Sequence, residues 1–149
     1  MEAIIFIGIQ GVGKSTFYRD YFFNTHIRIN MDMLKTRHRE QIFLQACLEG
    51  KQPFVVDNTN PTVEDRERYI IPAKTHKFRV MAYYFPADLE QCKQRNSQRP
   101  PKQIVPLVGL IGTYKKLVIP NWTEGFDAIY TVKSKLNYSF IVEEWQHEV

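Results

Sequence analysis

Short apolar runs alternate with longer amphipathic segments along almost the whole chain. The runs at residues 4–7, 54–56 and 80–85 carry no charge, which is typical of strands that are buried on both faces of a sheet. The segments between the runs place apolar residues three and four positions apart, as amphipathic helices do. Strands are therefore expected at residues 2–8, 27–30, 54–57, 77–85, 128–132 and 138–142.

Helices are expected between most of these strands, and several of their ends carry capping signals. Thr62 and Asp65 match a capping box, Asp88 and Pro106 are start signals, and Gly50 is a stop signal. This alternation predicts an α/β three-layer sandwich with a mostly parallel central sheet, whose last two strands form an edge hairpin. The helices are expected at residues 13–23, 33–49, 62–71, 88–97 and 106–117.

Length and composition narrow the class of protein. The 149 residues suffice for one domain, residues 1–149, and the content of 44% hydrophobic and 24% charged residues is that of a soluble globular protein. We expect no membrane-spanning segment and no signal peptide. Cys47 and Cys92 lack metal-ligand spacing, so free thiols in a reducing cytoplasm are expected. The net charge of +4 favours phosphate-rich partners.

The residues after the first predicted strand form a phosphate-binding loop. Positions 8–15 read G-I-Q-G-V-G-K-S, which matches the pattern G-x-x-x-x-G-K-[ST] between a strand and a helix. Backbone N–H groups of such a loop, and the helix after it, bind phosphate oxygens. Lys14 would reach the β- and γ-phosphates, and Ser15 would hold Mg²⁺. We expect ATP to contact Gly8, Ile9, Gln10, Gly11, Val12, Gly13, Lys14, Ser15 and Thr16.

Asp32 follows the second predicted strand, where a carboxylate would face the γ-phosphate from the acceptor side. There it can accept the proton of an attacking hydroxyl, or orient that hydroxyl for in-line transfer. Aspartate is also a common helix cap, so a cap for the following helix is the alternative role of Asp32. The spacing favours neither role over the other.

The third predicted strand ends in Asp57, and an N-T-N-P run follows it. A carboxylate at the end of an apolar strand is the usual second metal-associated group of phosphate-loop proteins, so Ser15 and Asp57 are the candidate metal ligands. The amides of Asn58 and Asn60 are suited to binding an acceptor. An ordinary Asx turn is the alternative explanation, but the apolar strand before Asp57 favours the functional one.

Arg95 and Arg99 lie four residues apart near the end of a predicted helix, so their guanidinium groups can share one face. The prolines at positions 100–101 then interrupt the helix. Paired arginines on a short segment can close over ATP and neutralise charge that develops on the transferred phosphoryl group. We therefore expect a lid over residues 95–105 rather than only a solvated helix end.

These segments together resemble one known family. G-x-x-G-V-G-K-S-T, N-M-D-M-L-K, V-D-N-T-N-P and R-N-S-Q-R resemble the 5′-hydroxyl polynucleotide kinase family, especially the kinase module of end-healing polynucleotide kinase/phosphatases. The tail from I-V-P to P-N-W-T-E-G-F-D-A-I is also similar, so the resemblance covers nearly the whole chain. It implies a P-loop NTPase or kinase-like fold. It also implies ATP and metal binding by Lys14 and Ser15, a general base at Asp32 and phosphate contacts from Arg95 and Arg99.

Lys35 departs from the pattern of that family. Three residues after the base, the family usually has an arginine that binds the 3′-phosphate of the acceptor, whereas this chain has Lys35. A lysine keeps the positive charge but loses the two-pronged geometry of a guanidinium group. Arg37 and Arg39 follow closely and are alternative cations for the acceptor.

The leading hypothesis is an ATP-dependent kinase with Mg²⁺ as cofactor that phosphorylates the 5′-hydroxyl of a DNA or RNA end in nucleic-acid repair. In this hypothesis Lys14, Asp32 and Arg95 are catalytic, and Asp32, Lys35, Asn58 and Asn60 bind the acceptor. A phosphatase or ligase partner is expected in a separate protein. Two alternatives are a kinase that acts on a small-molecule hydroxyl and a nucleotide-binding switch that hydrolyses ATP slowly.

Overall fold

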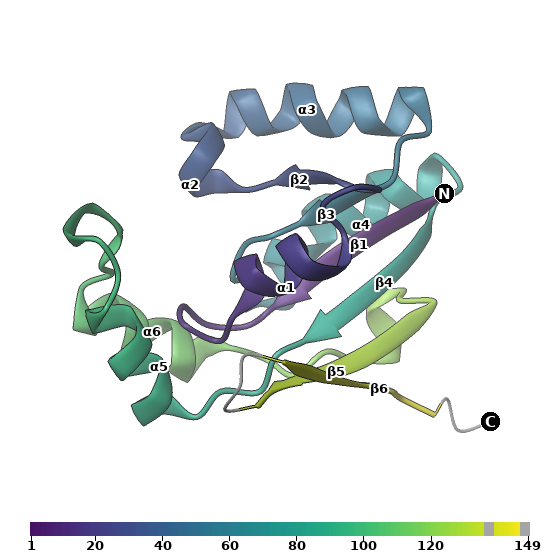
Figure 1. Cartoon of the computed structure of the whole chain (residues 1–149). Coiled ribbons are helices and arrows are strands. Elements are labelled where there is room, and N and C mark those ends of the chain that lie inside the picture. The colour runs from purple at the N-terminus through teal and green to yellow at the C-terminus, as the bar shows by residue number, and fades with distance from the viewer. Residues whose placement is uncertain (136–138, 147–149) are drawn as a thin grey trace.

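The computed structural model describes residues 1–135 and 139–146, and within them one six-stranded sheet forms the centre of the molecule (Figure 1). The order across the sheet is β2-β3-β1-β4-β5-β6. The first five strands run parallel to their neighbours, and β6 runs antiparallel to β5. The mostly parallel sheet and the C-terminal hairpin are therefore confirmed. The strands are β1 (Glu2–Ile7), β2 (Ile27–Ile29), β3 (Phe54–Val56), β4 (Arg79–Tyr84), β5 (Ala128–Ser134) and β6 (Phe140–Glu144).

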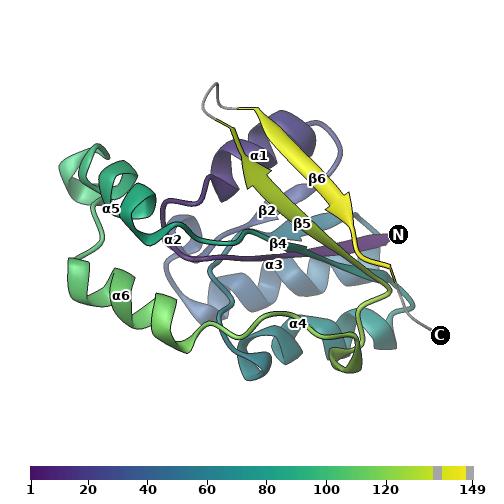
Figure 2. The same ribbon diagram turned by 90° about the horizontal axis from the view of Figure 1, so that it is seen from below.

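Helices cover both faces of the sheet, which confirms the three-layer sandwich (Figures 1 and 2). One face is covered by α3 (Arg37–Gly50) and α4 (Val63–Thr75), and the other by α1 (Lys14–Tyr21). Two further helices, α5 (Leu89–Ser97) and α6 (Leu107–Lys116), lie together at the end of the sheet where the phosphate loop emerges. In the described part of the chain, no helix is long and apolar enough to cross a bilayer. The short helical elements are α2 (Met31–Leu34) and the 3₁₀ turns η1 (Pro101–Gln103) and η2 (Trp122–Glu124).

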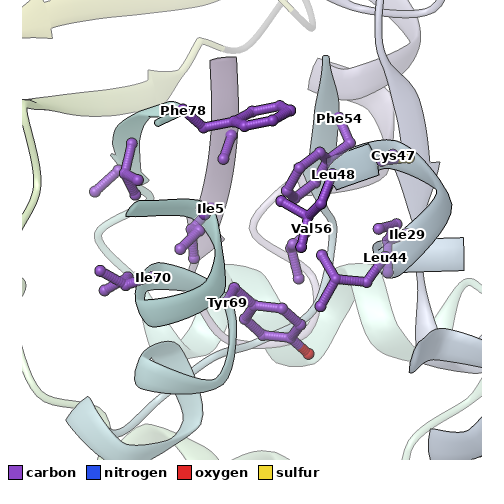
Figure 3. Packing of buried hydrophobic residues seen from close by; sticks show 14 of the residues in the cluster. Ile5, Ile29, Leu44, Cys47, Leu48, Phe54, Val56, Tyr69, Ile70 and Phe78 are labelled. Atoms are coloured by element: carbon purple, nitrogen blue, oxygen red, sulfur yellow. The ribbon is translucent and has the colours of Figure 1, made fainter. Parts of the chain in front are cut away.

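Alternate residues of β1 supply the two cores of the molecule. Ile5 packs with residues of α3 and α4, including Leu48 and Tyr69, on one face (Figure 3). Phe6 points to the other face, where its ring lies 5.8 Å from the ring of Phe17 in α1. A strand buried on both faces explains the uninterrupted apolar run in the sequence. The predicted free thiols, Cys47 and Cys92, are also buried in these cores.

The helix predicted over residues 33–49 is in fact two helices. The chain turns at Lys35, whose φ of 73° ends α2. The side chains of Asn30 and Thr36 each accept a hydrogen bond from the backbone N–H three residues ahead, and so cap α2 and α3. Asp32 therefore lies in the first turn of α2 and is not its cap.

Several element ends also differ from the prediction. Gly50 lies inside α3, and Lys51 takes the left-handed position at the end of that helix (φ 55°). Helix α4 starts at the predicted capping box but continues through Pro72, because Ala73 in the added turn is buried in the core. The last two strands extend two residues beyond the predicted ends, since their pairing continues there. The predicted start at Tyr138 lies outside the described residues.

A buried arginine of α4 holds the loop after β3 against the chain after α6. The Arg66 side chain is fully buried, and its Nη1 donates to both carboxylate oxygens of Glu124 at 3.2 and 3.0 Å. Its other nitrogens donate to the backbone carbonyls of Asn60, Pro61 and Val118. This one guanidinium group therefore fixes two segments that the sheet does not hold directly.

Arg66→Met should destabilise the fold by about 3 to 5 kcal/mol, because it leaves Glu124 as a buried, unpaired charge. Urea unfolding followed by circular dichroism measures the change in the free energy of unfolding. The exposed Arg68 on the same helix provides the matched control, and Arg68→Met should change stability by less than about 0.5 kcal/mol. Equal losses in the two variants would contradict the assigned role of Arg66.

Candidate active site

The phosphate loop between β1 and α1 has the backbone geometry that its sequence predicts. Gly11 and Gly13 adopt φ angles of 87° and 97°, which residues other than glycine rarely adopt. A Cβ at Gly11 would also lie 2.8 Å from the backbone oxygen of Cys92 in α5. The Lys14 Nζ donates to the carbonyls of Gly8 and Ile9 at 2.7 and 2.8 Å. The ammonium is thus held at the concave side of the loop.

The environment of Lys14 lowers its pKa below that of a lysine in water. Burial lowers its pKa to about 8, and the positive charge of Arg99 acts in the same direction, while the carboxylate of Asp57 opposes the shift. A bound triphosphate would favour the charged form instead. Proton binding by Lys14 is therefore coupled to nucleotide binding.

The two candidate metal ligands contact each other. Ser15 in the first turn of α1 donates from Oγ to the Oδ2 of Asp57 at 3.0 Å. The Asp57 side chain is only 1% exposed, whereas Ser15 is exposed. Hydroxyl and carboxylate oxygens are the ligands that Mg²⁺ prefers, so this pair fits the ion. In the described residues no group of three His, Cys, Asp or Glu could hold a metal.

Reciprocal hydrogen bonds join the ends of β2 and β3. The Asn30 Nδ2 donates to the backbone oxygen of Asp57 at 2.6 Å. In return, the backbone N–H of Met31 donates to the Oδ1 of Asn58 at 2.9 Å. Asp32 is the next residue, so these bonds fix the candidate base relative to the candidate metal ligand.

The two asparagines predicted to bind an acceptor both bond to protein groups. The Asn60 Nδ2 donates to the backbone oxygen of Phe6 at 2.8 Å, and this side chain is buried. The Asn58 Nδ2 lies 3.4 Å from the Oε2 of Glu40 and 3.3 Å from the hydroxyl of Tyr69. Asn60 therefore supports the end of β1, and the contact of either amide with an acceptor stays a prediction.

A cavity of about 380 Å³ brings half of the predicted site residues together. Lys14 and Ser15 lie on its phosphate-loop side, and Asp32 lines it from α2. Arg99 reaches it from the predicted lid. Lys35 is exposed and does not line this cavity, whereas Arg37 does. The remaining predicted residues on its wall are Gln10, Asp57, Asn58 and Asn60.

The Asn96 side chain joins the two ends of the predicted lid. Asn96 in α5 is buried, and its amide donates to the carbonyl of Val105 at 2.7 Å and accepts from the N–H of the same residue at 2.9 Å. Arg95 does not line the first cavity: its Nη1 donates to the oxygen of Gly11 and its Nη2 to the hydroxyl of Ser134, at 3.2 and 3.1 Å.

A second cavity of about 180 Å³ adjoins the phosphate loop at Gly13 and Thr16. Its walls include Arg95, Arg99, Ser134 and Phe140, and the Phe140 ring lies 3.3 Å from where a Cβ at Gly13 would be. No sequence pattern indicated Ser134 or Phe140, because the C-terminal hairpin brings them to the loop from far along the chain. The predicted contact residue Thr16 also lines this cavity.

Arg37 forms a hydrogen-bond network with the buried side chains of Glu40 and Tyr69, which the sequence did not predict. Its Nη1 donates to Glu40 Oε1 at 2.8 Å and to the Tyr69 hydroxyl at 3.1 Å, and Tyr69 donates to Glu40 Oε2 at 2.9 Å. Glu40 is 2% exposed. The spacing of three residues between Arg37 and Glu40 was an available signal, but nothing in the sequence indicated Tyr69.

Solved structures of other proteins share this fold. Kti12 from Chaetomium thermophilum superposes with a TM-score of 0.68 at 13% identity, covering 88% of each chain. A gluconokinase from Sinorhizobium meliloti superposes with a TM-score of 0.62 at 17% identity, covering 89% of this chain and 82% of its own. These likenesses concern the fold alone. Together with the phosphate loop, they show a P-loop kinase fold.

Sequence relatives narrow this class. A putative bifunctional polynucleotide phosphatase/kinase of Acanthamoeba polyphaga mimivirus is 35% identical over 138 residues, or 88% of this chain. A bifunctional polynucleotide phosphatase/kinase of Schizosaccharomyces pombe is 26% identical over 139 residues, or 90% of the chain. The chain spans about a third of the length of these relatives. The AAA domain family model AAA_33 matches residues 36–107. The predicted resemblance is confirmed: about 90% of the chain is similar to part of two relatives named bifunctional polynucleotide phosphatase/kinase, so the chain is polynucleotide kinase-like.

Nucleotide affinity should fall as the pH rises through about 8, because free Lys14 loses its proton there whereas the triphosphate complex retains it. Isothermal titration with a non-hydrolysable ATP analogue should give a Kd about tenfold higher at pH 9 than at pH 7. Lys14→Met should bind weakly and show no step in this range. A similar step in that variant would assign the titration to another group.

Proposed function

We propose that this chain transfers the γ-phosphoryl group of ATP to the 5′-hydroxyl of a DNA or RNA end, in the cytoplasm and with Mg²⁺ as cofactor. The observation that carries the proposal is the one cavity lined by Lys14, Asp32 and Arg99, since it combines a phosphate-binding cation, a base and a second cation. The relatives named polynucleotide phosphatase/kinase support a nucleic-acid acceptor. A phosphatase on a separate chain or segment acts alongside this module.

The acceptor side of the cavity is exposed and basic. Asp32 is exposed, and 54% of the Arg37 side chain is accessible. Lys35, His38 and Arg39 are exposed on the same segment. Such a rim attracts a phosphodiester backbone, whereas a pocket that encloses a small metabolite would cover these side chains. The exposed rim therefore favours a strand over a metabolite as the acceptor.

In the proposed reaction, Lys14 exchanges its bonds to the loop carbonyls for the phosphate oxygens of ATP. Asp32 takes the proton from the acceptor hydroxyl as the oxygen attacks the γ-phosphorus, and ADP leaves in line. Arg99 neutralises charge on the transferred group. Ser15 and Asp57 would hold Mg²⁺, which when bound neutralises negative charge on the phosphates.

Asp32→Asn should slow transfer to a 5′-hydroxyl oligonucleotide by about 10²-fold or more, because the amide cannot accept the proton. The assay follows labelled phosphate from ATP to DNA and RNA oligonucleotides and to a panel of hydroxylated metabolites. ATP affinity should change less than twofold, since the residue lies outside the phosphate loop.

The exposed Asp20 on α1 provides the matched control, and Asp20→Asn should transfer at the unaltered rate. Label found only on a metabolite would reject the nucleic-acid acceptor. Free phosphate as the sole product, released at the same rate by Asp32→Asn, would favour a nucleotide switch.

Arg37→Gln should raise the KM for the oligonucleotide by about tenfold, because Arg37 lines the cavity and can bind an acceptor phosphate through a guanidinium group. Lys35→Gln should raise it by less than about threefold, as expected for an exposed charge at the rim. Steady-state kinetics with a 3′-phosphorylated acceptor measures both. A larger effect at Lys35 would contradict this prediction. It would show that Lys35 binds the acceptor phosphate, as the family resemblance indicates.

A further inference from the structure

Arg28 makes close contact with both candidate metal ligands. From β2, its Nε donates to Asp57 Oδ2 at 2.8 Å, and its Nη2 donates to Ser15 Oγ at 3.0 Å. Ser15 in turn donates to the same Asp57 oxygen at 3.0 Å. The three side chains form a closed triangle in which the guanidinium group supplies the positive charge.

Arg28 is held in this position by the fold. It is the middle residue of β2, paired in register with Val55 of the neighbouring strand. Its guanidinium carbon lies 6.0 Å from the centre of the Tyr18 ring, within the range of a cation–π contact. Only 27% of the Arg28 side chain is exposed. This pair is therefore not a freely solvated surface ion pair, and its geometry is restrained on three sides.

The charge of Asp57 explains why a cation is needed here. Its carboxylate is 1% exposed, and a buried carboxylate without a partner is strongly destabilising. When no divalent ion is bound, Arg28 forms the one ion pair of Asp57 among the described residues. The guanidinium group therefore neutralises the charge of Asp57, as a bound metal would.

The same contacts conflict with metal binding. A divalent ion at Ser15 needs a lone pair of the hydroxyl oxygen, and Arg28 already donates to one of the two lone pairs on that oxygen. Two positive groups that share one oxygen also repel each other. The metal and the Arg28–Ser15 hydrogen bond are thus alternatives.

We propose that Arg28 is an internal competitor of the divalent metal: it neutralises Asp57 when no metal is bound and releases Ser15 when metal and nucleotide enter. Arg28 is on this account a positioning residue, which sets the metal concentration at which the site fills. The proposal concerns the nucleotide and metal side alone, so it holds whichever hydroxyl accepts the phosphoryl group.

Arg28→Met tests the competition, because methionine keeps an unbranched apolar side chain and removes the charge. ADP binding is measured by isothermal titration at a series of Mg²⁺ concentrations, with EDTA as the metal-free point. The Mg²⁺ concentration at half-maximal enhancement of ADP binding should fall about fivefold to tenfold, within the range of measured coupling between two sites. ADP affinity in EDTA should change less than twofold.

Two further variants complete the test. Arg79→Met removes an exposed arginine from β4 and should leave the Mg²⁺ midpoint unchanged. Arg28→Lys keeps the charge but loses the two-pronged contact, so its midpoint should lie between those of the wild type and Arg28→Met; this variant also serves if Arg28→Met does not fold. An unchanged or raised midpoint in both Arg28 variants would overturn the proposal, since the arginine would then not oppose the metal.

Discussion

The hydrogen bonds that join the ends of β2 and β3 are the constraint on which the site depends. Parallel strands deliver their following loops to one edge of the sheet, but loops that leave such an edge are otherwise free to diverge. Here Asn30 and Asn58 each bond to the backbone of the opposite loop. The candidate metal ligand Asp57 takes part in one of these bonds, and the candidate base Asp32 follows the other by one residue. Their separation is therefore set by the backbone rather than by flexible side chains.

The arrangement of ion pairs distinguishes the carboxylates around the cavity. Asp57 is paired with Arg28, and the buried Glu40 is paired with Arg37. Within residues 1–135 and 139–146, Asp32 forms no ion pair. In the proposed reaction Asp32 is the base, whereas Asp57 would hold the metal and Glu40 supports the hydrogen-bond network around Arg37.

The sequence was sufficient to predict those parts of the structure that one local pattern of residues determines. The phosphate loop, the buried strands and the capping box at Thr62 depend on neighbouring residues, and each was predicted correctly. The break at Lys35 was missed because an exposed lysine is an ordinary helix residue and its positive φ is imposed by two caps. Arg28 and Tyr69 were missed because their partners come from strands and helices distant in sequence, which no periodicity records.

The paired bonds between Asn96 and Val105 have a consequence for the dynamics of the lid. A loop whose two ends are joined has already lost its closure entropy during folding, so this loss does not weaken the binding of a ligand later. The predicted lid would then move as one closed loop instead of ordering residue by residue. Exchange of product for substrate would not wait for a disordered loop to refold.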